Sequence, residues 1–369
     1  MDVRRLLKKS FVFYRHNNYL IHIYDFFYFD KYLRVLVLRL TSLIFLTVST
    51  VISYGQLLPN FGGQRAGLSA LSFLKNDLNP SSFAMASASV ANEGSLFSSE
   101  SNPASLVQIK NSGIALSNLT IGAGINQSFL GTAIKLDGGG VLGFNVNSLN
   151  SGSMEVRTEF EPNGTGQLFY ANNTAVGINY AQQLSKRFSI GVGLKYVYEG
   201  IATYTNHTVT GDIGFLYSTD YKNLTFAVVV KNFGGNSQMQ GSDLETDFNR
   251  TTVSLEKYTT PTIFKMGFSF VPYETDNKKL LVAAELNHPS DNAENVRLGG
   301  ELGLRDLLFI RLGYKLSVKG QNYPTAGVGF KTRIGVHPLY INYGVNPTNK
   351  MGVQHLFGLN IPFNNDTRN

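Results

Sequence analysis

The chain contains no cysteine and no tryptophan among its 369 residues. Without cysteine it can form neither a disulfide bond nor a thiolate metal site. Charged residues are also scarce, at 15% of the sequence compared with roughly 25% in a typical soluble domain. Glycine, phenylalanine and tyrosine are abundant instead, with 37, 26 and 19 residues. This combination is typical of strands that bend around a closed wall and place aromatic rings at membrane interfaces.

The net charge of +7 is concentrated near the N-terminus. Residues 1–55 contain eight basic and three acidic side chains, and they therefore carry +5 of this charge. The rest of the chain has no face rich in lysine and arginine that could neutralise phosphates. The sequence thus argues against nucleic acid as a partner, and it assigns the basic character to an N-terminal targeting segment.

Residues 31–55 have the features of a secretory signal peptide. Basic side chains precede an apolar run over 40–52, and small residues stand at −3 and −1 from a cleavage site after Gly55. The rival interpretation, a membrane anchor, would have to bury Arg34 or Arg39, and the apolar run is short for a membrane-spanning helix. We therefore expect export and removal of this extension and signal.

From Asn111 onward, segments of about ten residues alternate apolar with polar or small side chains. In the segment 188–198, apolar residues alternate with a second set that contains glycine and lysine. The apolar residues are Phe188, Ile190, Val192, Leu194, Tyr196 and Tyr198. Because a strand points successive side chains to opposite faces, each segment has one apolar face. In a soluble β-protein such faces share a core, whereas in an outer-membrane barrel they face lipid and the polar faces line the lumen.

The number and spacing of these segments separate the two cases. We expect about fourteen strands, at roughly 111–121, 125–136, 140–150, 169–184, 187–199, 208–219, 223–233, 261–273, 278–288, 295–304, 307–317, 323–334, 337–346 and 352–363. An even count is required of bacterial single-chain barrels, whose short periplasmic turns alternate with longer external loops. The connections here alternate in this way, and the longer set includes 151–168 and 234–260. The sequence predicts an all-β fold, a transmembrane antiparallel barrel over 111–363 with a tail at 364–369.

The segment 56–110 differs from the strands that follow it. Residues 66–74 suit a short helix, and a later stretch is rich in alanine and serine without strand alternation. Asn102-Pro103-Ala104 is a turn signal that leads into the first strand. We expect a short, partly helical, plug-like entry segment. It could fold into the lumen or lie against the periplasmic rim.

Short motifs occur in a characteristic order between residues 66 and 363. They include Ala66-Gly67, Phe73-Leu74, Phe83-Ala84-Met85, Asn102-Pro103-Ala104, Asp212-Ile213-Gly214, Lys231-Asn232-Phe233-Gly234, His288-Pro289 and the runs 179–191, 195–199 and 311–315. In this order they resemble the PorV/PorQ family of outer-membrane proteins. The chain departs from that family at Ser101, which replaces a frequent tryptophan, at Ala86-Ser87, which replaces a glycine pair, and at an altered acidic pair. These departures discourage assignment to PorV or PorQ specifically.

The resemblance implies a fourteen-stranded barrel, related in fold to long-chain fatty-acid transporters, in the cell outer membrane of a bacterium of the Bacteroidota type. It also implies a non-enzymatic role in type IX protein secretion, in which such barrels handle cargo with C-terminal signal domains. The implied partners are outer-membrane lipid and either secreted cargo proteins or other secretion subunits.

The sequence contains no recognisable catalytic grouping. Its six histidines lack the spacing of metal ligands, and its closely spaced glycine pairs lack the helix that a dinucleotide site requires. We therefore expect neither a metal nor a cofactor.

The strongest polar cluster is expected inside the barrel. Glu285, Arg297, Glu301 and Arg311 fall on the lumen faces of three consecutive strands, where opposite charges can pair across the sheet. We interpret them as a structural ladder of ion pairs. The alternative is a polar lining that contacts a peptide or a solute.

The last of these strands also gives a test of register. We expect Ile310, Leu312 and Tyr314 to face lipid. Arg311 and Lys315 should face the lumen. A lysine at Gly313 should then be far milder than an arginine at Leu312, unless the lysine clashes with a packed lumen.

Two functions stay open at this point. One is a protein-binding component of type IX secretion, in which the loops 151–168 and 234–260 are external contact surfaces. The loop 234–260 is mildly acidic. The second function is a channel for hydrophobic small molecules, which should show a continuous apolar pocket and a gap beside the plug. The charged lumen positions count against the channel. A purely structural membrane protein is a third, weaker option.

Overall fold

A computed structural model describes residues 68–92, 94–241, 255–318, 320–321 and 323–363. The expected signal peptide, the tail 364–369 and residues 242–254 of the second long loop lie outside these ranges. Within the described residues, we find no helix that is both long and apolar enough to cross a membrane.

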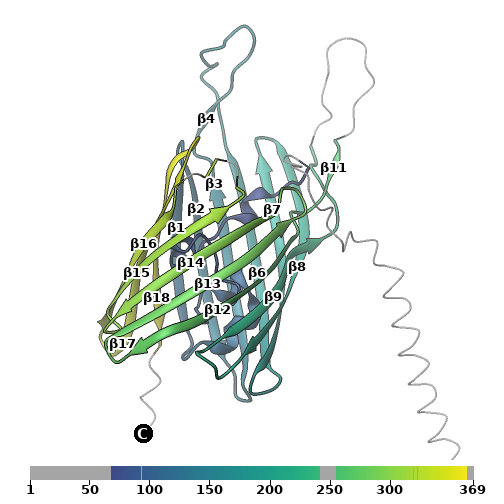
Figure 1. Ribbon diagram of the computed structural model, residues 1–369. Coiled ribbons are helices and arrows are strands. Elements are labelled where there is room, and N and C mark those ends of the chain that lie inside the picture. The colour runs from purple at the N-terminus through teal and green to yellow at the C-terminus, as the bar shows by residue number, and fades with distance from the viewer. Residues whose placement is uncertain (1–67, 93, 242–254, 319, 322, 364–369) are drawn as a thin grey trace, which may run out of the picture. The chain divides into compact units, whose positions relative to one another are not determined.

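Fourteen antiparallel strands close into one barrel (Figure 1). They are β1 (Gly113–Gly122), β2 (Ile125–Lys135), β3 (Gly140–Asn150), β6 (Ala171–Gln183), β7 (Phe188–Ile201), β8 (Tyr204–Ser218), β9 (Thr225–Gly234), β12 (Ile263–Thr275), β13 (Lys278–Pro289), β14 (Asn295–Leu304), β15 (Leu308–Leu316), β16 (Thr325–Ile334), β17 (His337–Thr348) and β18 (Gly352–Pro362). Strand β18 pairs with β1 and completes the ring. The predicted all-β barrel and its strand number are confirmed.

The two ends of the barrel differ in their connections. At one end two loops carry small hairpins, in which β4 (Met154–Glu155) pairs with β5 (Leu168–Phe169) and β10 (Ser237–Gln238) pairs with β11 (Lys257–Tyr258). The last strand ends at the opposite end, where short turns join β2 to β3 and β14 to β15 (Figure 1). Since outer-membrane barrels have short periplasmic turns and longer external loops, the end with the hairpins is the outer end.

The alternation of side chains around the wall follows the predicted register. In β15, Leu312 is 59% exposed on the outside, whereas its strand neighbour Arg311 is only 5% exposed on the inside. Ile310 and Tyr314 share the outer face with Leu312. The register predicted for this strand is therefore confirmed.

This register predicts the effect of a charge on the outer wall. Arginine in place of Leu312, which lies at the middle of β15, should cost about 2–4 kcal/mol of folding free energy, because a guanidinium at the bilayer midplane loses its hydration. The matched control is Leu307→Arg in the exposed turn before β15, where the expected cost is about 0–1 kcal/mol. Urea unfolding of the barrel in lipid vesicles measures both, and equal losses would contradict the register.

The inner position Gly313 lies where the lumen is packed. A Cβ atom at Gly313 would lie 2.3 Å from the backbone nitrogen of Ala86 and 2.3 Å from the carbonyl carbon of Met85. A lysine there would collide with the main chain of the entry segment. The exception stated with the expectation of a mild lysine, a clash with a packed lumen, therefore applies at this position.

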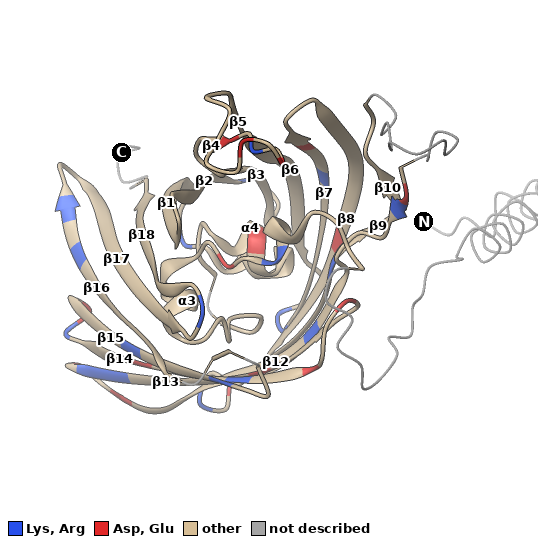
Figure 2. Cartoon of the chain, turned by 90° about the horizontal axis from the view of Figure 1, so that it is seen from above, with Lys and Arg blue, Asp and Glu red and all other residues tan. Residues whose placement is uncertain are grey.

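The entry segment folds into the lumen as a plug, which is the first of the two placements that its sequence left open (Figure 2). Its helices are all short, namely η1 (Ser72–Lys75), α3 (Pro80–Ala84), α4 (Ser98–Ser101) and η2 (Pro103–Gln108). Residues 66–67 of the helix expected over 66–74 lie outside the described ranges, and within the described part η1 is the helical element. Leu71 has a left-handed backbone with φ of 58°, and a right-handed helix cannot continue through it.

The main apolar core lies between the plug and one part of the wall. The plug contributes Leu78, Phe83, Leu96, Phe97, Leu106 and Ile109, and the wall residues that meet them come chiefly from β1, β2, β3 and β18. Burying a side chain of this size stabilises the fold by about 1.5–3 kcal/mol relative to leaving it in water. We call strands β18, β1, β2 and β3 the apolar wall.

Candidate functional site

The predicted turn at Asn102 is fully buried within the plug. The side-chain Nδ2 of Asn102 donates a hydrogen bond to the carbonyl oxygen of Val90 at 2.9 Å, and its Oδ1 accepts one from the backbone N–H of Ala104 at 3.0 Å. Asn102 thereby caps η2. Pro103 follows at the first helical position, where a missing N–H costs nothing.

Glycines in the wall accept the plug at very short range. A Cβ atom at Gly191 of β7 would lie 2.2 Å from the nitrogen of Ala104, and one at Gly214 of β8 would lie 2.0 Å from Oδ1 of Asn102. Only a residue without a side chain allows atoms of the plug to approach the backbone of the wall in this way. Gly313 performs the same role on the other side of the lumen.

Glu285 of β13 joins the plug to the wall. Its Oε2 accepts hydrogen bonds from the backbone N–H groups of Ser89 and Val90, each at 3.0 Å. Its Oε1 lies 3.1 Å from Nζ of Lys265 and 3.8 Å from a guanidinium nitrogen of Arg297. One buried carboxylate thus holds two wall cations and two donors of the plug.

The other two residues of the predicted ladder, Glu301 and Arg311, lie on β14 and β15, closer to the end with the short turns. Glu301 and Arg311 are directly opposite each other, and Nε of Arg311 donates to a carboxylate oxygen of Glu301 at 2.5 Å. Arg311 also donates to Oδ1 of Asn342 at 2.9 Å. All four residues predicted from the sequence lie on the inner face, but they form two separate groups rather than one continuous ladder.

Two further buried ion pairs were not predicted. Lys195 of β7 lies 2.8 Å from a carboxylate oxygen of Asp212 on β8, and Lys231 of β9 lies 3.5 Å from Glu100 in the plug. Strand alternation places Lys195 and Asp212 on the inner face, so the first pair could have been found. The second depends on the path of the plug, which alternation does not reveal.

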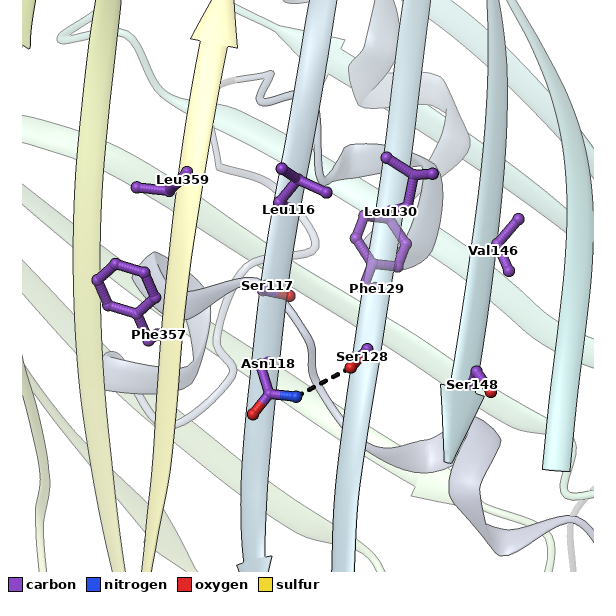
Figure 3. A pocket seen from close by; sticks show the side chains of 10 residues that line it. All are labelled: Leu116, Ser117, Asn118, Ser128, Phe129, Leu130, Val146, Ser148, Phe357 and Leu359. Carbon is purple, nitrogen blue, oxygen red and sulfur yellow. Dashed lines mark hydrogen bonds between the residues drawn. The ribbon is translucent and has the colours of Figure 1, made fainter. Parts of the chain in front are cut away.

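An open groove of about 420 Å³ crosses the outer face of the apolar wall (Figure 3). Asn118 and Ser128 form its polar margin and share a hydrogen bond of 2.9 Å. The apolar side chains that line it are Leu116, Phe129, Leu130, Val146, Phe357 and Leu359. The groove therefore lies directly outside the strands whose inner faces hold the plug's apolar core.

Comparisons with known proteins identify the fold. No protein-family model matches the sequence, and no curated protein is similar to it. Among solved structures, the Ralstonia pickettii toluene transporter TbuX is 10% identical with a TM-score of 0.51, covering 78% of this chain and 98% of the transporter. A Pseudomonas aeruginosa FadL homologue is 9% identical with a TM-score of 0.52, covering 81% and 99%. The P. putida toluene transporter TodX is 10% identical with a TM-score of 0.50, covering 77% and 96%.

At these identities the likeness concerns the fold alone. The chain has the fold of FadL-like outer-membrane transport barrels, which supports an outer-membrane location. The resemblance to the PorV/PorQ family stays a prediction.

Proposed function

We propose that the protein conducts hydrophobic small molecules across the outer membrane and has no enzymatic activity. The observation that carries this proposal is the concentration of apolar surface on both faces of the apolar wall. Phe129 of β2 lies beneath the groove: it is 2% exposed, and its ring packs on the inner side against Phe97 of the plug, with the ring centroids 5.5 Å apart. A hydrophobic solute gains about 25 cal/mol for each Å² of apolar surface that it buries. The outer face of this wall exposes such surface, and the inner face would expose it where the plug separates from the wall.

The anchoring of the plug suggests where a solute could pass. The ion pairs between plug and wall that involve described residues connect Glu100 to β9 and Lys75 to Asp291, which follows β13. The plug meets the apolar wall through apolar packing and a few hydrogen bonds instead. Separation there would break no described ion pair. The fold of the two toluene transporters supports this type of cargo.

Type IX secretion is the second candidate function. It is favoured by the ordered PorV/PorQ-like motifs and by the β4–β5 hairpin, which projects from the outer end (Figure 1). Phe160 in this hairpin loop is 95% exposed and stands between Glu159 and Glu161. Aromatic side chains are enriched where proteins bind one another, so the hairpin suits contact with cargo or a partner subunit.

A disulfide between plug and wall tests the transport proposal in a chain that has no cysteine. The Cβ of Ser99 lies 3.7 Å from the position of a Cβ at Gly143 on β3, which is within the normal disulfide range. Oxidised Ser99→Cys/Gly143→Cys should lower uptake of labelled toluene by cells to the level of a gene deletion, because the plug can no longer leave β3. Reduction should restore uptake.

The control keeps the cysteine at Gly143 and moves its partner into the wall. Asn179→Cys on β6 offers a Cβ at 3.5 Å from the same position, and this bridge leaves the plug untied. It should leave uptake unchanged. Equal uptake in the oxidised and reduced plug-tethered proteins contradicts the proposed route. A deletion strain with normal uptake but reduced surface display of secreted proteins would favour the second candidate.

A further inference from the structure

Near the outer end of the lumen, the inner face of β12–β15 carries an excess of positive side chains. Arg297 of β14 and Lys315 of β15 are directly opposite residues in the antiparallel register. Directly opposite Cβ atoms lie about 4.5–5.5 Å apart, and like charges at such a pair are destabilising. Lys265 of β12 adds a third cation, since it shares the carboxylate of Glu285 with Arg297.

The acids that face this cluster already have other partners. Glu285 is divided between its wall cations and the plug N–H groups described above. Asp77 of the plug acts electrostatically on Lys265 and Lys315, but its carboxylate accepts hydrogen bonds from the backbone N–H of Asn79 and the hydroxyl of Ser82. Three cations therefore face two carboxylates that are each held by the plug.

Lys315 is the least compensated member of the cluster. Within the part of the chain that the structure describes, it forms no hydrogen bond and no ion pair. It shares the inner face of β15 with Arg311 and Gly313, and it is partly buried. The residue opposite it, Arg297, donates to Asn295 at 3.0 Å and has only the longer contact with Glu285.

We propose that Lys315 and Arg297, supported by the positive potential of Lys265, bind the oxyanion group of a solute that enters from the outer end. Ammonium and guanidinium groups suit an anion with several oxygens, and phosphate and carboxylate share this chemistry. A bound anion would offset the repulsion between the opposed cations. This site goes beyond hydrophobic transport and does not depend on it.

The experiment measures thermal unfolding of the purified barrel and calorimetric binding of small anions. Inorganic phosphate and acetate are each compared with chloride at equal ionic strength. We expect one or both to raise the Tm of the wild type, because a ligand that binds only the folded state stabilises it. The anion that gives the larger shift and a measurable binding heat identifies the head group.

Lys315→Gln provides the decisive variant. In chloride it should melt above the wild type, because the repulsion with Arg297 is relieved, and neither anion should then raise its Tm. The matched control is Lys331→Gln on β16, where Lys331 pairs with Asp306 near the opposite end; this variant should keep the anion effect.

Two results would overturn the site. One is a wild type that shows neither a Tm shift nor binding heat with either anion. The other is a Lys315→Gln barrel that melts below the wild type in chloride and still responds to anions. Neither the melting measurement nor the calorimetry involves solute uptake. Failure of the anion site can therefore be distinguished from failure of the transport proposal.

Discussion

Replacing Glu285 by alanine is expected to detach the plug from the β12–β14 wall and to cost about 3–5 kcal/mol of unfolding free energy. The large effect follows from what the substitution leaves behind. Lys265 loses its close partner, Arg297 loses its nearby carboxylate, and the N–H groups of Ser89 and Val90 lose their acceptor. An uncompensated buried charge and two buried unpaired donors each carry a desolvation penalty.

Urea unfolding in detergent micelles and amide hydrogen exchange together measure this prediction. Exchange at Ser89 and Val90 should accelerate in Glu285→Ala, since their protection depends on that carboxylate. Glu301→Ala is the control, because it breaks an ion pair within the wall and leaves the plug contacts intact. Unchanged protection of Ser89 and Val90 in Glu285→Ala would show that the plug is held by other contacts.

The strands could be predicted from the sequence because each one repeats the same two-residue alternation. A face such as Ile310, Leu312 and Tyr314 carries the signal independently of its neighbours, and the turn lengths order the strands around the ring. The plug carries no such periodic signal. Its helices span four to six residues, and a short helix has little amphipathic pattern to detect.

Partners across the lumen were the harder part of the prediction. Arg297 was expected to complete a ladder with Glu285, since the two residues are neighbours on adjacent strands. The structure gives the closer contact to Lys265, which lies on the other side of β13. The groups that complete the coordination of Glu285 come from the plug, about 200 residues earlier in the chain. The alternation of side chains along a strand predicts which face a residue lies on. It does not predict which of the long side chains on that face will form an ion pair.

Function was less accessible than fold for a related reason. The same barrel can serve different cargo, because cargo choice depends on the groove, the lumen charges and the loops rather than on the strand count. The ordered motifs favour protein secretion, while the structure's apolar wall favours a hydrophobic solute. In either case the plug is held by buried hydrogen bonds at some contacts and by apolar packing at others.

Replacing Gly214 by alanine tests one of the firm contacts directly. The added Cβ would lie 2.0 Å from Oδ1 of Asn102, which is closer than any non-bonded pair of these atoms. Either the cap of η2 moves or the wall of β8 bends, and overpacking of this kind costs about 1–3 kcal/mol. If the cap is expelled, loss of the Asn102 hydrogen bonds adds about 1 kcal/mol.

The contrast with Gly211→Ala on the same strand makes the result specific. A Cβ at Gly211 would meet its nearest atoms at 3.6 and 3.8 Å, which is ordinary contact. Alanine there should be neutral or stabilise by about 0.5–1 kcal/mol, since glycine weakens a strand interior. Adding Asn102→Gly to Gly214→Ala should recover part of the loss, because it removes the atom that clashes. Independent, additive effects of the two changes in a double-mutant cycle would mean that Gly214 and Asn102 do not meet, and that the plug lies elsewhere in the lumen.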